Sequence, residues 1–93
     1  MQLVGKDKLR EFVERHPTAR SWVAAWTKEV LAAQWHRPQD VKDRYASASI
    51  IDSTTIIFNV KGNAFRMEVR VSYPTSVVMV VRCGTHAEYD RWK

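Results

Sequence analysis

Residues 55–71 read TIIFNVKGNAFRMEVRV, and this stretch decides the fold. Two runs rich in β-branched and aromatic residues flank the dipeptide Gly62-Asn63, which is typical of a tight turn between antiparallel strands. Apolar and polar residues alternate along both runs, as they do in strands that bury one face. The sequence therefore predicts a β-hairpin whose loop is Gly62-Asn63.

The pairing within this hairpin follows from its turn. A two-residue loop puts Val60 opposite Phe65 and carries the register on to Thr55 opposite Arg70. Because side chains alternate across a strand, the apolar and the polar residues separate onto opposite faces. The polar face then collects Thr55, Asn59, Lys61, Arg66, Glu68 and Arg70, together with Ile57.

The connection to the following strand decides where Arg82 points. A loop with an odd number of residues, such as 74–76, pairs Glu68 with Arg82 and leaves the arginine on the polar face. An even loop would direct the guanidinium into the apolar face, which is costly. We therefore predict a loop of three or five residues. The same register places Val78 and Val80 on the polar face, as the floor of a cleft.

Outside the hairpin, the hydrophobic period separates a helical half of the chain from a strand-rich half. Apolar residues recur at helical spacing in 6–16 and 18–35, and a shorter helical segment, 39–45, follows Pro38. Strand-like runs follow at 49–51, 54–60, 64–73 and 77–82, separated by short turns. Such short connections require antiparallel pairing.

These elements predict one α+β domain spanning residues 1–93. We expect two N-terminal helices and a short third to pack on one face of a twisted antiparallel sheet, with a short C-terminal helical turn. Trp22 and Trp26, four residues apart on the second helix, are expected in the core rather than on a base-stacking surface.

Composition limits the class of partner. Fifteen Lys and Arg residues against ten Asp and Glu residues give a net charge of +5, which favours nucleic acid, a ribosome, an acidic protein segment or a membrane surface. Cys83 is the only cysteine, so a disulfide within the chain and a zinc site of several thiolates are excluded. With no apolar stretch long enough for a bilayer and no signal peptide, we expect a cytoplasmic protein.

The C-terminal segment holds the groups that titrate or donate protons. Thr85 and Glu88 have the spacing of a capping box, so a helical turn should begin there. On that turn His86 and Tyr89 share one side, just past the strand that carries Arg82. Proton donors and acceptors beside basic strands are what a metal-free ribonuclease needs.

The same residues have other possible uses. A metal site of His86, Glu88 and Asp90 is disfavoured because the three do not share one helical face, and no cofactor is expected. The basic face of the sheet could also be an ordinary solvated face on which Glu68 bridges the arginines.

Residues 58–66 (FNVKGNAFR) followed by 84–90 (GTHAEYD) resemble the HigB family of type II toxin–antitoxin toxins, in the RelE-like superfold. The likeness extends to 8–12 and 45–49. It implies a ribosome-dependent endoribonuclease that cuts mRNA in the ribosomal A site and is neutralised by a HigA-like helix-turn-helix antitoxin. By position, the family's active-site residues fall on Lys61, Arg66, Arg82, His86 and Tyr89.

The hypothesis assigns a role to each side chain. RNA cleavage without a metal uses the substrate's 2′-OH as nucleophile, and histidine suits acid or base work near neutral pH. His86 would be that acid or base, with Tyr89 as partner proton donor or base-stacking ring. Guanidinium groups match phosphate oxygens, which suits Arg66 and Arg82 to the charged intermediate. Lys61 would assist electrostatically, and Asn59, Asn63 and Arg70 would position the RNA.

Two rival interpretations remain open at this point. One keeps the fold and changes the target to DNA gyrase, as in ParE-like toxins. The other is a non-catalytic RNA- or ribosome-binding domain, in which the same cations hold phosphates without cleavage.

Overall fold

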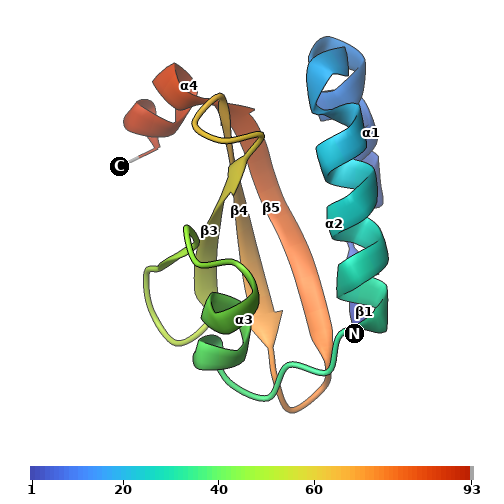
Figure 1. Cartoon of the computed structure of the whole chain (residues 1–93), viewed down its shortest axis with the longest axis vertical. Coiled ribbons are helices and arrows are strands. Elements are labelled where there is room, and N and C mark those ends of the chain that lie inside the picture. Colours follow the sequence, from blue (N-terminus) through green and yellow to red (C-terminus); the bar gives the residue numbers. More distant parts are fainter. Residues whose placement is uncertain (93) are drawn as a thin grey trace.

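The computed structural model describes residues 1–92 and shows a five-stranded sheet with α1 and α2 on one side and α4 on the other (Figure 1). The helical elements are α1 (Lys6–Arg15), a 3₁₀ turn (Pro17–Ala19), α2 (Arg20–Ala32), α3 (Pro38–Arg44) and α4 (His86–Arg91). The strands are β1 (Gln2–Val4), β2 (Ser49–Ile50), β3 (Thr55–Val60), β4 (Phe65–Ser72) and β5 (Val77–Thr85). Their order in the sheet is β1-β5-β4-β3-β2.

The predicted α+β class is confirmed, with one difference in the sheet. Strands β2 to β5 form the expected antiparallel meander. Strand β1 pairs parallel with β5, which makes the sheet mixed. Short connections do not determine how β1 pairs, because the chain between β1 and β5 contains all the other strands and three of the α-helices.

The register predicted for the central hairpin is confirmed along its length. Val60 lies opposite Phe65 and Thr55 lies opposite Arg70. The turn occupies 61–64, and its left-handed residues are Lys61 (φ 52°) and Gly62 (φ 66°). The polar residues of the hairpin therefore face away from α1 and α2, on the open face of the sheet.

The predicted loop between β4 and β5 is wrong in length. Ser72 pairs with Val77, which leaves four residues, 73–76, in the connection. This even loop turns Val78 and Val80 inward, where both are 0% exposed. Their predicted place on the polar face is therefore wrong, because two fully buried valines stabilise the core more than they would a solvated surface.

Arg82 nevertheless lies on the open face, opposite Glu68 as predicted. The reason is a β-bulge. Glu68 pairs with Arg82 but the next residue, Val69, pairs with Val80, so Val81 is an extra residue in β5. A bulge shifts the alternation of side chains by one position. Strand β5 can thus bury Val80 and expose Arg82, which a regular strand would place on the same face.

The core lies between the sheet and helices α1, α2 and α3. Trp26 is 1% exposed, and its ring meets that of Phe58 at 5.4 Å in a T-shaped arrangement. Phe58 in turn meets Tyr45, after α3, at 5.2 Å. Trp22 is partly buried against the core and stacks on Trp26 with 6.4 Å between ring centroids, so the predicted core role of this pair is confirmed.

Gly5 allows β1 to pass directly into α1. Its backbone is left-handed (φ 94°), and a Cβ at this position would lie 2.9 Å from the carbonyl oxygen of Val80. Any side chain would therefore push α1 away from β5, the strand that carries the bulge.

We predict that Gly5→Ala lowers the free energy of unfolding. Overpacking against Val80 costs about 1–3 kcal/mol, and the left-handed backbone costs an alanine about 1–2 kcal/mol more. Gly62→Ala is the matched control, because its φ is also positive but no atom lies within 4 Å of the added Cβ. Urea unfolding followed by tryptophan fluorescence measures both losses. Equal losses would contradict the proposed clash.

Candidate functional site

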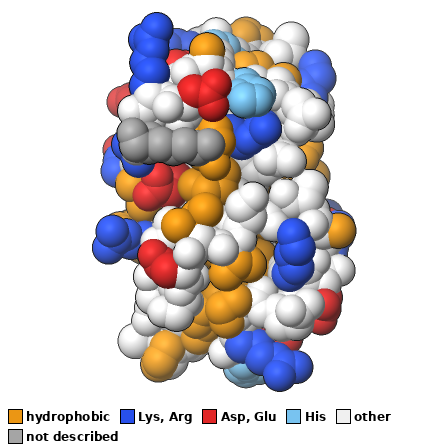
Figure 2. Space-filling model, turned by 90° about the vertical axis from the view of Figure 1, so that its left-hand side faces the viewer, with side chains coloured by type: hydrophobic (Ala, Val, Ile, Leu, Met, Phe, Trp, Pro, Cys, Tyr) orange, Lys and Arg blue, Asp and Glu red, His pale blue; other side chains and the backbone are white. Residues whose placement is uncertain are grey.

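The open face of the sheet carries an apolar band with Lys and Arg side chains on both sides of it (Figure 2). Two hollows lie on this face. The first, of about 280 Å³, is called the α4 hollow and is lined by Ile51, Thr55, Ile57, Glu68, Arg82, Tyr89 and Trp92. The second, of about 380 Å³, is called the Arg70 hollow and is lined by Thr54, Arg70, Val71, Ser72, Thr75, Val77 and Met79.

Helix α4 begins with the predicted capping box. The Glu88 amide donates to Thr85 Oγ1 at 3.1 Å, and the Thr85 amide donates to Glu88 Oε1 at 3.0 Å. The second bond holds the pKa of the Glu88 carboxyl below its usual value, because the backbone donor favours the ionised form. The His86 amide also donates to the carbonyl of Ala64, at 3.3 Å. The start of α4 is thus tied to the end of the β3–β4 turn.

Gly84 lets α4 fold back over the open face. It lies opposite Arg66 in the ladder, directly before the capping box. A Cβ on Gly84 would lie 3.1 Å from Glu88 Cβ and 3.1 Å from Trp92 Cζ2. The missing side chain therefore creates the space into which the helix packs.

Two arginines of the sheet lie against two aromatic rings at the C-terminal end. The guanidinium carbon of Arg66 is 5.5 Å from the centroid of the Tyr89 ring, and that of Arg82 is 4.6 Å from the Trp92 ring. The two rings meet at 5.7 Å with an interplanar angle of 81°. Cation–π contacts of this kind hold a guanidinium in place without neutralising its charge.

The two arginines differ in their counter-ions. Arg82 Nε donates to Glu68 Oε1 at 2.8 Å, so its charge is paired. Arg66 is only 9% exposed and donates from Nη1 to the carbonyl of Phe65 at 3.0 Å. Among residues 1–92, the arginines with an ion pair are Arg37, Arg44 and Arg82. Arg66 is therefore a largely buried cation without a carboxylate partner in the described part of the chain.

His86 and Tyr89 share one side of α4, as predicted. Their ring centroids are 6.4 Å apart, in an edge-to-face arrangement. His86 Nδ1 also lies 3.8 Å from Asp90 Oδ2, one helical turn further on, and both side chains are exposed. A carboxylate at this position can orient the imidazole ring.

The structure gathers some of the predicted site residues and separates others. His86 and Tyr89 lie on α4, and Arg66 and Arg82 lie against the aromatic rings at this end of the chain. Lys61 and Asn63 are exposed in the β3–β4 turn, and Asn59 is half-buried opposite Arg66. Arg70 lies apart from this group and lines the Arg70 hollow. Glu68 bonds to Arg82, whereas the sequence had suggested bridges to three arginines.

Sequence reasoning missed Trp92 and Gly84. Trp92 follows Tyr89 by three residues, a spacing that predicts rings on one side of a helix and was an available signal. Gly84 offered no such signal, because its importance depends on what packs over it.

Cys83 is not a candidate nucleophile. Burial raises the pKa of its thiol to about 12, so the thiol stays protonated near neutral pH. No three His, Cys, Asp or Glu side chains within residues 1–92 are grouped so that they could hold a metal ion. In the same part of the chain, no helix has the length and apolar character needed to cross a bilayer.

A model of the HigB toxin family, described as the RelE-like toxic component of a toxin–antitoxin system, matches residues 19–92. The matched segment runs from α2 to α4 and includes every residue of the cluster around α4. The resemblance predicted from the sequence is confirmed. No curated protein matches the chain.

We predict that Thr85→Ala loosens α4. Losing the hydroxyl leaves the Glu88 amide without its partner, which costs about 1 kcal/mol of helix stability. Amide hydrogen exchange of residues 87–91 measures this as faster opening. Thr85→Ser keeps the hydroxyl and should retain the protection of the natural chain. Unchanged exchange in the alanine variant would contradict the capping role.

The capping box also predicts a dependence on pH. Because the pKa of Glu88 is lowered in the folded chain, its carboxylate stabilises α4 above the usual pKa of 4.5. This stabilisation is lost as the pH falls through the lowered value. Unfolding measured between pH 7 and pH 3 should show a smaller acid-induced loss for Glu88→Gln than for the natural chain. Parallel curves would show that Glu88 does not contribute.

Proposed function

We propose that this chain, which belongs to the HigB family of RelE-like toxins, is a ribosome-dependent endoribonuclease that cuts mRNA. The observation that carries the proposal is Arg66, a cation that is 9% exposed and has no carboxylate partner among residues 1–92. Burying an unpaired charge is expensive, so such a site favours a ligand that brings the missing negative charge. A phosphate of RNA is that ligand.

His86 and Tyr89 supply the groups for proton transfer next to this phosphate site. Tyr89 contacts both Arg66 and His86, so the three side chains form a continuous row. In the proposed reaction the 2′-OH loses its proton, its oxygen attacks the adjacent phosphorus, and the 5′-oxygen leaves with a proton. His86 acts as acid or base, and Tyr89 acts as its partner proton donor or stacks on a base.

The two arginines have different roles in this proposal. Arg66 is free to bind the phosphate whose charge increases during the reaction, and a guanidinium can do so with two parallel hydrogen bonds. Arg82 is already paired with Glu68, so it adds less net charge and holds Trp92 in place. Lys61 adds positive charge from the turn, while Asn59 and Asn63 help to position the RNA.

Membership in the family implies an antitoxin partner. We propose that this partner is a HigA-like helix-turn-helix protein, and that the toxin acts in the cytoplasm, where translating ribosomes present the mRNA. The charge of +5 is consistent with a polyanionic target.

We predict that His86→Ala and Arg66→Lys each reduce mRNA cleavage by about 10²–10³-fold, the usual effect of removing one oriented catalytic donor. Primer extension on mRNA from cells that briefly express the natural chain should show discrete cuts within translated frames. His36→Ala is the matched control, because His36 is exposed and lies two residues before α3, outside the cluster around α4.

The same experiment separates the rival functions. Growth arrest without cuts in the mRNA would indicate that the toxin acts on gyrase, or that it blocks the ribosome without cleaving mRNA. A loss of less than tenfold in the His86 variant, with RNA binding intact, would remove His86 from the chemistry. Circular dichroism of each purified variant checks that the fold is retained.

A further inference from the structure

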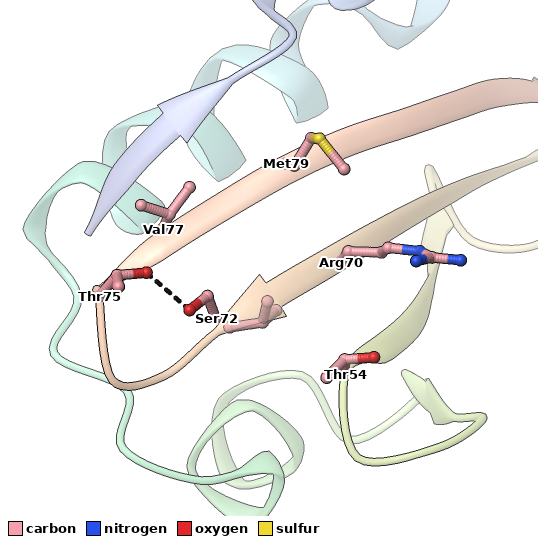
Figure 3. Close-up of a pocket in the computed structure, with 7 residues that line it drawn as sticks. Thr54, Arg70, Ser72, Thr75, Val77 and Met79 are labelled. Carbon is pink, nitrogen blue, oxygen red and sulfur yellow. Dashed lines mark hydrogen bonds between the residues drawn. The ribbon is translucent and has the colours of Figure 1, made fainter.

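The Arg70 hollow combines three kinds of contact within one small volume (Figure 3). Met79 and Val77 of β5 give it an apolar floor, Ser72 and Thr75 give it hydroxyl groups, and Arg70 of β4 gives it a cation. Its volume of about 380 Å³ falls in the range of small-molecule sites, roughly 300–1,000 Å³. The face that it occupies is the one that carries the α4 hollow.

The floor of the hollow is an exposed methionine in the interior of the sheet. Met79 is 40% exposed, although β5 is flanked by strands on both sides. The backbone of Met79 is paired with β1 and β4, so only the Met79 side chain is available to a ligand. A thioether makes favourable contacts with aromatic rings, which suits Met79 to lie against the face of a base.

The hydroxyl groups at one end of the hollow are held in place. Thr75 Oγ1 donates to Ser72 Oγ at 2.6 Å, as Figure 3 shows. This bond uses the hydroxyl hydrogen of Thr75 and leaves that of Ser72 free to be donated to a ligand. A hydroxyl donor of this kind can contact a base edge, a 2′-OH or a phosphate oxygen.

Arg70 supplies a positive charge that has no ion pair among residues 1–92. Its guanidinium points away from the hydroxyl pair of Ser72 and Thr75 (Figure 3). Glu68, the acid nearest to it on that face of β4, is bonded to Arg82. In the loop before β3, the Asp52 carboxylate accepts hydrogen bonds from Thr54 and Thr55. Asp52, like Glu68, is therefore already bonded to residues other than Arg70.

The two hollows follow each other along the same strands. Thr54 lines one and Thr55 lines the other, and Arg70 stands two residues beyond Glu68 on the same face of β4. Arg66 and Arg70 stand four residues apart on β4, which in a strand is about 13 Å, a distance that two nucleotide steps of an extended strand can cover. A chain of phosphates that contacts Arg66 could therefore continue past Arg70.

We propose that the Arg70 hollow binds a further nucleotide of the single-stranded RNA, further along β4 from the nucleotide whose phosphate binds Arg66. The base lies on Met79, the Ser72 hydroxyl contacts the base edge or the ribose, and Arg70 binds the phosphate between the two hollows. This inference rests on the proposed function, because it takes RNA as the substrate of the open face.

A peptide fits this hollow less well than RNA. At the hollow, Val77, Val78 and Met79 of β5 pair with both β1 and β4, and Arg70 of β4 pairs with both β3 and β5, so these residues offer no strand edge to which a peptide could add. What remains is a cation, a hydroxyl donor and a small apolar platform, which match the phosphate, the polar edges and the ring of a nucleotide.

The test compares variants of the full chain on ribosomes programmed with a short mRNA. Arg70→Ala removes the charge and Met79→Ala removes the platform. Arg10→Ala on α1 and Leu31→Ala on α2 are matched controls, because both residues are exposed on helices that cover the other face. With toxin below saturation, we expect each hollow variant to cut about tenfold more slowly, and the controls to cut at the natural rate.

A second readout does not depend on cleavage. The His86→Ala chain is mixed with single-stranded RNA that contains 4-thiouridine, irradiated and digested, and the crosslinked peptides are identified by mass spectrometry. We expect crosslinks within residues 70–79, and fewer of them when Arg70→Ala is added.

The outcomes separate the two proposals. Crosslinks within residues 70–79, without cleavage by the natural chain, would reject the nuclease and retain the nucleotide site. Normal cleavage by both hollow variants, with crosslinks only near α4, would overturn the nucleotide site alone. Hollow variants that lose antitoxin binding but crosslink RNA normally would also overturn it, and would assign the hollow to a protein partner.

Discussion

A single extra residue in β5 allows the strand to bury Val80 and to expose Arg82, which a regular strand would place on the same face. The first half of β5 must bury Val78 and Val80 against the helices, and the second half must present Arg82 to the open face. Val81, the residue added at the bulge, shifts the alternation between these halves. It also puts Gly84 on the open face, so α4 can fold back there rather than continue away from the sheet. The core and the candidate site therefore depend on the same irregularity.

The electrostatics of the site follow from the position of α4 on the open face of the sheet. Tyr89 covers Arg66 and Trp92 covers Arg82, but within residues 1–92 Arg82 has a carboxylate partner and Arg66 has none. Covering a cation with an aromatic ring excludes water and leaves the charge in place, so it strengthens the attraction for an incoming anion. This arrangement stabilises the folded chain less than a full ion pair would. It is what a site for a phosphate requires, because a resident carboxylate would compete with the substrate.

How far the sequence could predict this structure depends on the range of each interaction. The register from Val60–Phe65 to Thr55–Arg70 was predictable, because a turn and the alternation of side chains are local signals. The capping box of Thr85 and Glu88 was predictable for the same reason. The bulge was not, because it depends on helices packing against β5 from far away in the chain. The parallel pairing of β1 with β5 and the contact of Trp92 with Arg82 are equally non-local, so composition and spacing could predict neither.

The open face then divides along β4 into regions with different chemistry. At its start, Arg66 lies beneath Tyr89, which also contacts His86. Further on, Arg70 and Met79 form a surface with charge and apolar area whose lining residues include no His or Tyr. An RNA substrate of the proposed nuclease that spans both regions would be bound along the strand and would react only at one end. Binding energy from the distant region can then hold the reacting phosphate in position, which is how remote contacts raise a rate without taking part in the chemistry. The strands that pair with β4 on both sides keep that distance fixed, so in the proposed nuclease the spacing between Arg66 and Arg70 would determine which nucleotide is cut.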